Sequence, residues 1–304
     1  MSNILGLDLG YSSIKISYNG QFYKVPSMIS FYNSSSIQFG NIKKYDFEGE
    51  TYTVGEASSD DSFTTTDYNF LYRFAPLMIY HIIKQLEVPG KPIIKTGLAL
   101  IDWGDEEKRK SFTDRISTIT VNNETIECDI QLVGPQGNGC FRSYIHENDM
   151  YGDKMPKKMS VIDIGYRTIN FLNYENGIPN PTKSKSFPDH GVVTIIKPFT
   201  NMLENKYKIN FSEQEAIKIF LDGEFSFGGV IQEDIPAEIQ QAKNKFVQKL
   251  MNSILVSEKK ILQLSDIVLI SGGGAYMLKD MTLPPNVVFG KGLAEFENCA
   301  GYLL

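Results

Sequence analysis

The chain opens with short apolar runs separated by glycine- and asparagine-bearing turns. Asn3–Leu9, Ile14–Tyr18 and Phe22–Val25 predict three strands joined by these turns. The period becomes helical from Tyr68 to Leu86, where apolar residues recur on one stripe. Ile93–Ile101 again predicts a strand. The first part of the chain therefore mixes strands with a core helix.

The second half of the chain restarts with strands and then becomes helical. Ile126–Val133 predicts a strand before the restart, and Met159–Ile164 and Thr168–Tyr174 predict two more after it. An α/β fold class follows from this mixture of elements. Helical spacing is expected over about Val192–Tyr207, Ser212–Leu221 and, in one long helix, Pro236–Leu262.

One polar turn is written twice in the chain. DLGYSSIK runs from Asp8 to Lys15, and DIGYRTIN runs from Asp163 to Asn170. The acid, the glycine, the tyrosine and the isoleucine recur at identical offsets, and each copy lies between two expected strands. A repeated opening module predicts a duplicated α/β fold with a cleft between the two halves.

The repeated turn carries the chemistry of an anion site. Asp8 and Asp163 each end an apolar strand shortly before a glycine, and glycine lets backbone N–H groups approach a ligand closely. The hydroxyls of Ser12, Ser13 and Thr168 add donors. Two facing turns would hold a polyphosphate from both sides, with both carboxylates near a hydrated Mg²⁺. A single copy would more simply be a turn that opens a β-hairpin.

A cation and a glycine run complete the candidate site. Lys15 stands where an ammonium group would reach the phosphates, whereas the second copy has Asn170 there. The apolar strand Ile267–Ile270 leads directly into Gly272–Ala275, where a base or a phosphate can lie against bare backbone. GGGA lacks the full dinucleotide-binding spacing, so a tight strand-to-helix turn is the alternative interpretation.

Composition excludes several classes of protein. The 304 residues exceed what one hydrophobic core usually holds, so two domains are expected. The content of 42% hydrophobic and 22% charged residues is that of an ordinary globular protein. The net charge of −6 argues against broad nucleic-acid or membrane-surface binding. Cys128, Cys140 and Cys299 form no metal-binding or disulfide pattern. With neither a signal peptide nor a membrane span in the sequence, we expect a cytoplasmic protein.

The three motifs together resemble those of a known superfamily. Asp8–Lys15 resembles the first phosphate motif of the actin, Hsp70 and sugar-kinase superfamily, Asp163–Thr168 its second, and Gly272–Ala275 its adenosine motif. Within that superfamily, the chain resembles bacterial and archaeal actin-like proteins of the ParM plasmid-segregation type. It shares their compact length, the region from Thr66 to Leu100 and the turn Pro135-Gln136-Gly137. The terminal FENCAGYL is similar to their segment that crosses back to the first domain.

The resemblance implies duplicated actin-like, ribonuclease H-like domains with a nucleotide cleft between them. Domain I would span 1–150, with a small subdomain at about 20–65, and would be completed by 290–304. Domain II would span 151–289, with an insertion subdomain at about 178–235.

The resemblance also implies ATP or ADP bound with Mg²⁺ in the cleft. Asp8 and Asp163 would orient the metal through water, and Gln136 would orient the attacking water as the third catalytic residue. Since an amide is a poor base, catalysis would rest on alignment and electrostatics. The implied nucleotide-binding residues are Gly10, Tyr11, Ser12, Ser13, Lys15, Gly165, Tyr166, Arg167, Thr168, Gly272, Gly273, Gly274 and Ala275.

Two departures from the family pattern concern catalysis. ParM relatives often carry glutamate where this chain has Gln136, so the departure falls on the residue that would set the rate of hydrolysis. Tyr166-Arg167 stands where relatives often have glycine and a small residue. Its bulk narrows the turn in one interpretation; Arg167 either adds charge for the phosphates or points to solvent.

Three functions remain open at this point. The first is an ATPase whose subunits assemble into nucleotide-dependent filaments for plasmid or DNA segregation. Such a filament would attach its cargo through a DNA-binding adaptor protein, because the acidic chain itself is not expected to bind nucleic acid or membrane. The second is a small-molecule kinase that uses the same cleft, and the third is a nucleotide-binding scaffold that does not polymerise. The chain offers no clear kinase base or substrate pocket, which favours the filament.

Overall fold

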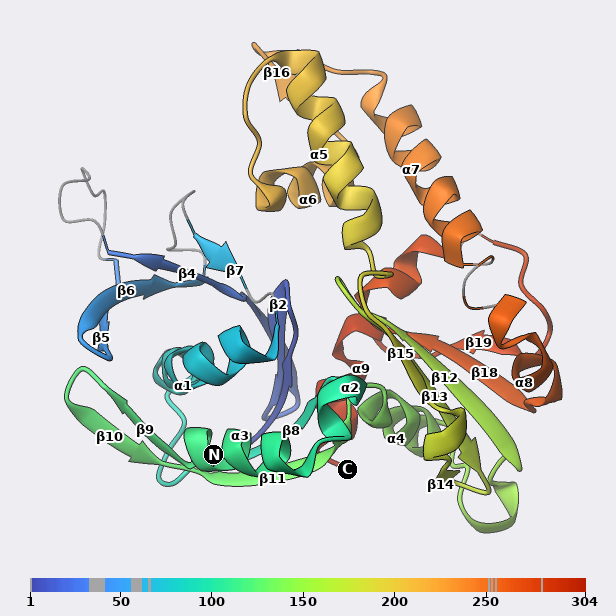
Figure 1. Ribbon diagram of the computed structural model, residues 1–304, viewed down its shortest axis with the longest axis horizontal. Helices are drawn as coiled ribbons and strands as arrows, with labels where there is room; N and C mark the ends of the chain where they lie inside the picture. The colour runs from blue at the N-terminus through green and yellow to red at the C-terminus, as the bar shows by residue number, and fades with distance from the viewer. Residues whose placement is uncertain are drawn as a thin grey trace.

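The computed structural model has two lobes, each built around a sheet (Figure 1). Lobe I contains the strands and helices up to β11, and lobe II contains those from β12 to β19, while α4 (Asn138–Glu147) and α9 (Glu297–Gly301) lie between the two sheets. The structure describes residues 2–32, 42–55, 62–64, 67–250, 252, 254, 256–279 and 281–304.

The main sheets of the two lobes repeat one topology. In lobe I, β1 (Ile4–Leu9) pairs antiparallel with β2 (Ser13–Tyr18) and parallel with β8 (Ile93–Leu98). In lobe II, β12 (Lys158–Ile164) pairs antiparallel with β13 (Ile169–Glu175) and parallel with β18 (Ile267–Ser271). The registers also correspond, since Asp8 lies opposite Lys15 and Asp163 lies opposite Asn170. The predicted duplication is therefore present in the strand order.

Lobe I packs its core helix between the main sheet and a smaller sheet (Figure 1). Asp67 caps that helix by accepting a bond from the Phe70 N–H at 2.9 Å, and the apolar stripe predicted for it is buried. This core helix is α1 (Tyr68–Gln85). The other lobe I elements are β3 (Gln21–Pro26), β4 (Met28–Phe31), β5 (Tyr45–Phe47), β6 (Glu50–Val54), β7 (Phe63–Thr64), α2 (Leu100–Trp103), α3 (Glu106–Ser117), β9 (Thr118–Val121), β10 (Glu124–Glu127) and β11 (Asp129–Pro135).

Lobe II covers both faces of its sheet, which explains the continuous burial along its central strands. Met159 and Val161 pack with α4 on one face, and Ile162 and Ile164 pack with α5 and α7 on the other. The other lobe II elements are β14 (Ile178–Pro179), β15 (Lys185–Phe187), α5 (Val193–Tyr207), α6 (Glu213–Asp222), β16 (Ser226–Phe227), β17 (Val230–Ile231), α7 (Ile235–Leu250), α8 (Lys259–Leu264) and β19 (Val287–Phe289).

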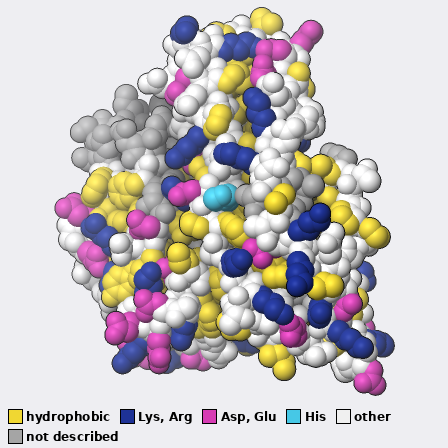
Figure 2. Space-filling model, turned by 45° about the vertical axis from the view of Figure 1, so that its right-hand side comes forward, with side chains coloured by type: hydrophobic (Ala, Val, Ile, Leu, Met, Phe, Trp, Pro, Cys, Tyr) yellow, Lys and Arg dark blue, Asp and Glu magenta, His cyan; other side chains and the backbone are white. Residues whose placement is uncertain are grey.

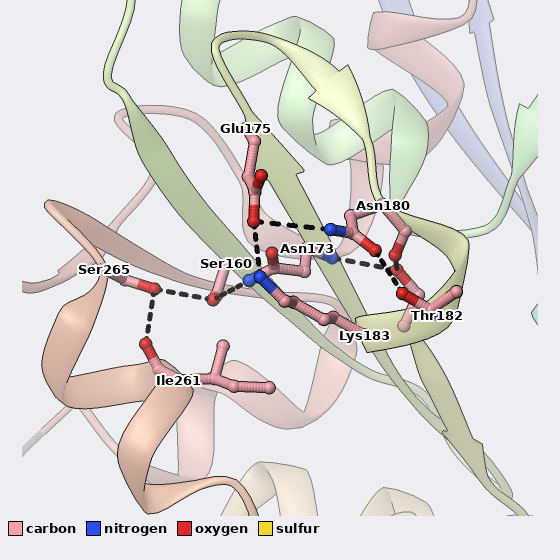
Figure 3. Close-up of polar contacts among 9 residues, drawn as sticks. Ser160, Asn173, Glu175, Asn180, Thr182, Lys183, Ile261 and Ser265 are labelled. Atoms are coloured by element: carbon pink, nitrogen blue, oxygen red, sulfur yellow. Dashed lines mark hydrogen bonds and ion pairs between the residues drawn. The ribbon is translucent and has the colours of Figure 1, made fainter.

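The long helix predicted over 236–262 is wrong. The structure has α7 and α8 instead, and Figure 1 shows them with different directions. Between them the described residues 252, 254, 256 and 257 are still helical, and the chain turns at Glu258, which is buried and accepts from the Lys185 Nζ at 2.7 Å. Figure 3 shows the end of α8 tied to the sheet, with the Ser265 hydroxyl 2.9 Å from that of Ser160.

Two strand predictions also had wrong limits. The single strand expected over 126–133 is divided between β10 and β11, and a β9–β10 hairpin precedes the division. Asn122 and Asn123 both have positive φ in that hairpin, which asparagine tolerates better than most residues. The strand expected to reach Ile101 ends at Leu98, because the chain enters α2 at Leu100.

The surface carries both signs of charge. Figure 2 shows Lys and Arg side chains among acidic ones over one face, with apolar side chains between them. None of the helices in the described ranges is long and apolar enough to cross a membrane.

Candidate functional site

The two repeated turns have the same tight geometry. A Cβ on Gly10 would lie 2.8 Å from the Ser13 carbonyl oxygen, and one on Gly165 would lie 2.9 Å from the Thr168 carbonyl oxygen. The turn that follows each strand is thus too tight to accommodate a side chain at its glycine. The glycine amides of the two turns bond differently, since that of Gly10 donates to the Asp8 carbonyl at 3.0 Å and that of Gly165 to the Thr168 carbonyl at 2.9 Å. Both turns present backbone without a side chain at the glycine, which lets a ligand approach closely.

The two repeated carboxylates are both buried, and both have raised pKa values. Asp8 is 7% exposed and Asp163 is 5% exposed. Burial raises the pKa of Asp8, opposed by the Lys15 ammonium and by the amides of Gln136 and Asn298. Burial and then the negative charge of Asp8 raise the pKa of Asp163 to about 6. The negative charge of Asp8 thus acts on Asp163, and the Asn298 amide lowers the pKa of both carboxyl groups.

Each carboxylate accepts a hydrogen bond from a carboxamide. The Gln136 Nε2 donates to the Asp8 Oδ1 at 2.9 Å. The Asn298 Nδ2 donates to the Asp163 Oδ2 at 3.0 Å. Gln136 belongs to the loop before α4, and Asn298 lies on α9. The structure therefore brings Gln136 to the first carboxylate, and it adds Asn298, which the sequence reasoning missed although FENCAGYL was noted.

The glycine run lies directly beside the second turn. A Cβ on Gly272 would lie 2.4 Å from the Asp163 Oδ1, and one on Gly274 would lie 2.2 Å from the Ile164 Cγ2. Gly273 has more room, since the nearest atom to its Cβ position is 3.9 Å away. This arrangement follows from the parallel pairing of β12 and β18, which end at the same edge of the sheet. Ala275 follows in a short 3-10 helix and is buried.

The first turn holds the cation and an unsatisfied hydroxyl. The Lys15 Nζ would lie 3.0 Å from a Cβ on Gly10, so the ammonium group points at the turn. The buried Ser13 Oγ has no hydrogen-bond partner among the described residues. Ser27, a further residue that the sequence reasoning missed, donates its hydroxyl to the Gly10 carbonyl at 2.7 Å and its amide to the Ser12 carbonyl at 3.0 Å. The turn is thus held from behind, and the Ser13 donor remains available.

The bulky residues of the turns contact opposite sides of the cleft. Tyr11, Arg167 and Thr168 line a cavity of about 500 Å³ between the lobes, together with Asp102. Burial and then the charge of Asp102 raise the pKa of Tyr11. The Arg167 Nη2 lies 3.6 Å from an Asp189 oxygen, so its charge is already paired within lobe II. The Tyr166 hydroxyl donates to Glu213 at the start of α6.

The donor set fits a hydrated magnesium ion. Among the described residues no group of three or more His, Cys, Asp or Glu side chains could hold a metal. Two carboxylates suffice for Mg²⁺, which keeps several waters and takes the rest of its ligands from phosphates. The glycine cradles and the free Ser13 hydroxyl suit those phosphates.

Both halves of the chain match models of actin-like families. Residues 6–139 match the N-terminal domain of actin-like proteins, and residues 161–282 match the C-terminal part of archaeal MreB-like actin homologues. No curated protein sequence matches the chain.

Solved structures show the same fold over nearly the whole chain. A native crystal structure of an archaeal actin homologue is 19% identical, with a TM-score of 0.80 over 98% of this chain and 97% of that chain. The subunit of a 15-stranded ParM filament from Clostridium botulinum is 19% identical, with a TM-score of 0.77 over 99% and 97%. Bacillus thuringiensis ParM with AMPPNP is 16% identical, with a TM-score of 0.69 over 99% and 98%. The fold is therefore the two-domain actin-like fold, as the motifs predicted.

Proposed function

The chain belongs to the actin-like superfamily, and from that premise we propose that it binds and hydrolyses Mg·ATP between its lobes and assembles into nucleotide-dependent filaments. The supporting observation is the pair of buried carboxylates, Asp8 and Asp163, at the ends of two duplicated glycine turns. In this proposal the protein is cytoplasmic and segregates plasmid or other DNA through a DNA-binding adaptor.

The domains are proposed with the same limits as above. Domain I comprises 1–150 and 290–304, and domain II comprises 151–289 with its insertion at about 178–235. Figure 1 supports the insertion, because α5 and α6 stand apart from the lobe II sheet. The helix α4 packs its buried face on β12, β13 and β18, so it joins domain I to the sheet of domain II.

The proposed roles follow the geometry of the two turns. The Gly10–Ser13 turn and Lys15 bind phosphate oxygens from one side, and Gly165–Thr168 binds them from the other. Asp8 and Asp163 hold the hydrated Mg²⁺, which neutralises phosphate charge when bound. Gly272–Ala275 lines the nucleoside.

Gln136 is the residue that we propose to orient the attacking water. Its amide now donates to Asp8, within the same group of side chains as the candidate metal carboxylates. Rotation of the amide away from Asp8 would free it to bind a water beside the terminal phosphate. Because a carboxamide does not take up a proton at neutral pH, this chain would gain rate by aligning the water and would hydrolyse ATP slowly.

Several of the similar structures support the choice of ligand and assembly. The archaeal actin homologue was also solved with ADP, and Bacillus thuringiensis ParM was solved with ATP. The Clostridium botulinum ParM forms a 15-stranded filament. Since these proteins share the fold at less than 20% identity, both properties are proposals for this chain.

High-speed pelleting with and without Mg·ATP tests the proposal. We expect the protein to enter the pellet only with nucleotide, and Asp163→Ala to remain folded but lose both hydrolysis and pelleting. Asp153→Ala is the matched control, because Asp153 is an exposed acid outside the cleft. A protein that stays in the supernatant at every concentration and phosphorylates a sugar would instead be a small-molecule kinase. Nucleotide binding without pelleting or turnover would indicate the scaffold.

A further inference from the structure

The two connections between the lobes meet in a close crossing of α4 and α9. A Cβ on Gly139 would lie 2.2 Å from the Asn298 carbonyl oxygen, and one on Gly301 would lie 1.8 Å from the Gly139 carbonyl oxygen. The backbone of α9 also touches β1, since a Cβ on Gly6 would lie 2.1 Å from the Cys299 carbonyl oxygen. The backbone of α9 around Asn298 is therefore held between α4 and β1.

Hydrogen bonds fix the direction of the Asn298 carboxamide as well. Its Oδ1 accepts from the Gly137 N–H at 2.8 Å, and its Nδ2 donates to the Asp163 Oδ2 at 3.0 Å. An N–H can only donate, so the oxygen must face Gly137 and the NH₂ group must face the carboxylate. Only 4% of Asn298 is exposed, so water does not replace these bonds.

The loop that carries Gln136 is clamped at the same point. Gly137 has a φ of +93° and directly follows Gln136, whose amide donates to Asp8. A Cβ on Gly137 would lie 2.5 Å from the Leu172 Cδ1 on β13, so the loop sits against the lobe II sheet. Asn298 thus connects the Asp163 carboxylate to the backbone next to the water-orienting candidate.

We infer that Asn298 is a positioning residue for the nucleotide site, an inference that rests on the proposed function. Its carboxamide fixes the position of the Asp163 carboxylate relative to the loop that carries Gln136, so that groups from both lobes can contact the same Mg·ATP. Only a carboxamide supplies an acceptor for the Gly137 N–H and a donor for the carboxylate at this length. Aspartate keeps the acceptor but sets a second negative charge against Asp163.

The alternative is that Asn298 serves only the packing of α9. Removing the carboxamide would then lower the stability of the protein and weaken the binding of nucleotide equally with and without Mg²⁺. A positioning residue behaves differently, because its loss misplaces one carboxylate and mainly weakens binding that depends on the metal. Partners that orient a metal-binding carboxylate typically contribute about 10- to 100-fold in metal affinity or activity.

Asn298→Asp separates these cases, with Asn286→Asp as the matched control. Asn286 also uses its Nδ2 as a donor, to the carbonyls of Leu262 and Ser265 at 3.0 Å each, and it lies outside the cleft. Affinity for a fluorescent ATP analogue is measured with Mg²⁺ and with EDTA, alongside thermal unfolding. For Asn298→Asp we expect affinity to fall about 10- to 100-fold with Mg²⁺ and by no more than about twofold in EDTA. The control should match the wild type in both.

Each other outcome counts against a defined statement. A folded Asn298→Asp protein with the wild-type response to Mg²⁺ would overturn the positioning role. So would an equal loss of affinity with Mg²⁺ and with EDTA, which would leave Asn298 a packing residue. If Asn298→Asp does not fold, Asn298→Ser is judged by the same two criteria. A wild-type protein that binds no nucleotide would refute the proposed function itself, together with this inference.

Discussion

A single methyl group at the crossing of α4 and α9 should destabilise the protein strongly. Gly139→Ala places a Cβ 2.2 Å from the Asn298 carbonyl oxygen and 2.7 Å from the Asn298 Cα, both backbone atoms that cannot rotate away. Ordinary contacts begin at 3.4 Å, so one helix must move by about 1 Å. Such a shift disturbs α9, β1 and the site between them.

The size of the effect follows from what resists the shift. The helix α4 is held on its other face by the ring of Phe141, which stacks on Tyr174 with centroids 3.8 Å apart. Overpacking at such a site costs about 1 to 3 kcal/mol, and alanine returns up to about 1 kcal/mol of helix propensity. We expect a net loss of about 1 to 2 kcal/mol in the free energy of unfolding.

Urea unfolding followed by circular dichroism measures this loss, with Gly104→Ala as the control. Gly104 has a φ of −64°, and the nearest atom to its Cβ position is 3.9 Å away. Alanine should therefore be neutral there or stabilise by about 0.5 kcal/mol. A Gly139→Ala protein as stable as Gly104→Ala would show that the two helices do not cross as closely as described.

Three further predictions concern the glycine run and two titratable groups, the buried Glu297 and the partly buried His81. Gly272→Ala should abolish nucleotide binding in a filter assay, because the new Cβ would lie 2.4 Å from the Asp163 carboxylate. Gly273→Ala should still bind nucleotide, because the nearest atom to its Cβ position is 3.9 Å away. Equal nucleotide binding by the two variants would contradict the packing described for this glycine run. Burial raises the pKa of Glu297 from 4.5 to about 7. The free energy of unfolding of the wild type should therefore fall by about 3 kcal/mol as the pH rises from 4.5 through 7. Urea unfolding of Glu297→Gln should not show this fall. Burial lowers the pKa of His81 from 6.5 to about 4. The contribution of the neutral imidazole to folding stability is therefore complete above pH 6.5 and is lost as the pH falls towards 4. A His81→Gln protein whose stability falls with acid as steeply as that of the wild type would refute this.

The sequence was informative where a local pattern has one physical meaning. The repeated DxG turn predicted two equivalent strand ends, and Asp8 and Asp163 occupy equivalent registers in the two sheets. The apolar stripe of α1 predicted a core helix, because helical spacing places those residues on one face. Whether the residues of the turns bind nucleotide remains a prediction.

Contacts between distant segments could not be predicted in the same way. Asn298 meets Asp163 across 135 positions, and the close approach depends on glycines of α4 and α9 whose meaning appears only when the helices cross. Likewise, nothing local indicates that Ser27 holds the first turn. The long helix was wrong because the chain turns at Glu258, whose buried carboxylate pairs with Lys185 on the distant strand β15, and no local pattern indicates this contact.

The structure of the protein bound to Mg²⁺ and a non-hydrolysable ATP analogue tests the central claim most directly. We expect the triphosphate between Gly10–Ser13 and Gly165–Thr168, with Asp8 and Asp163 facing the metal through water. A nucleotide bound elsewhere, with both carboxylates still engaged only by Gln136 and Asn298, would contradict it.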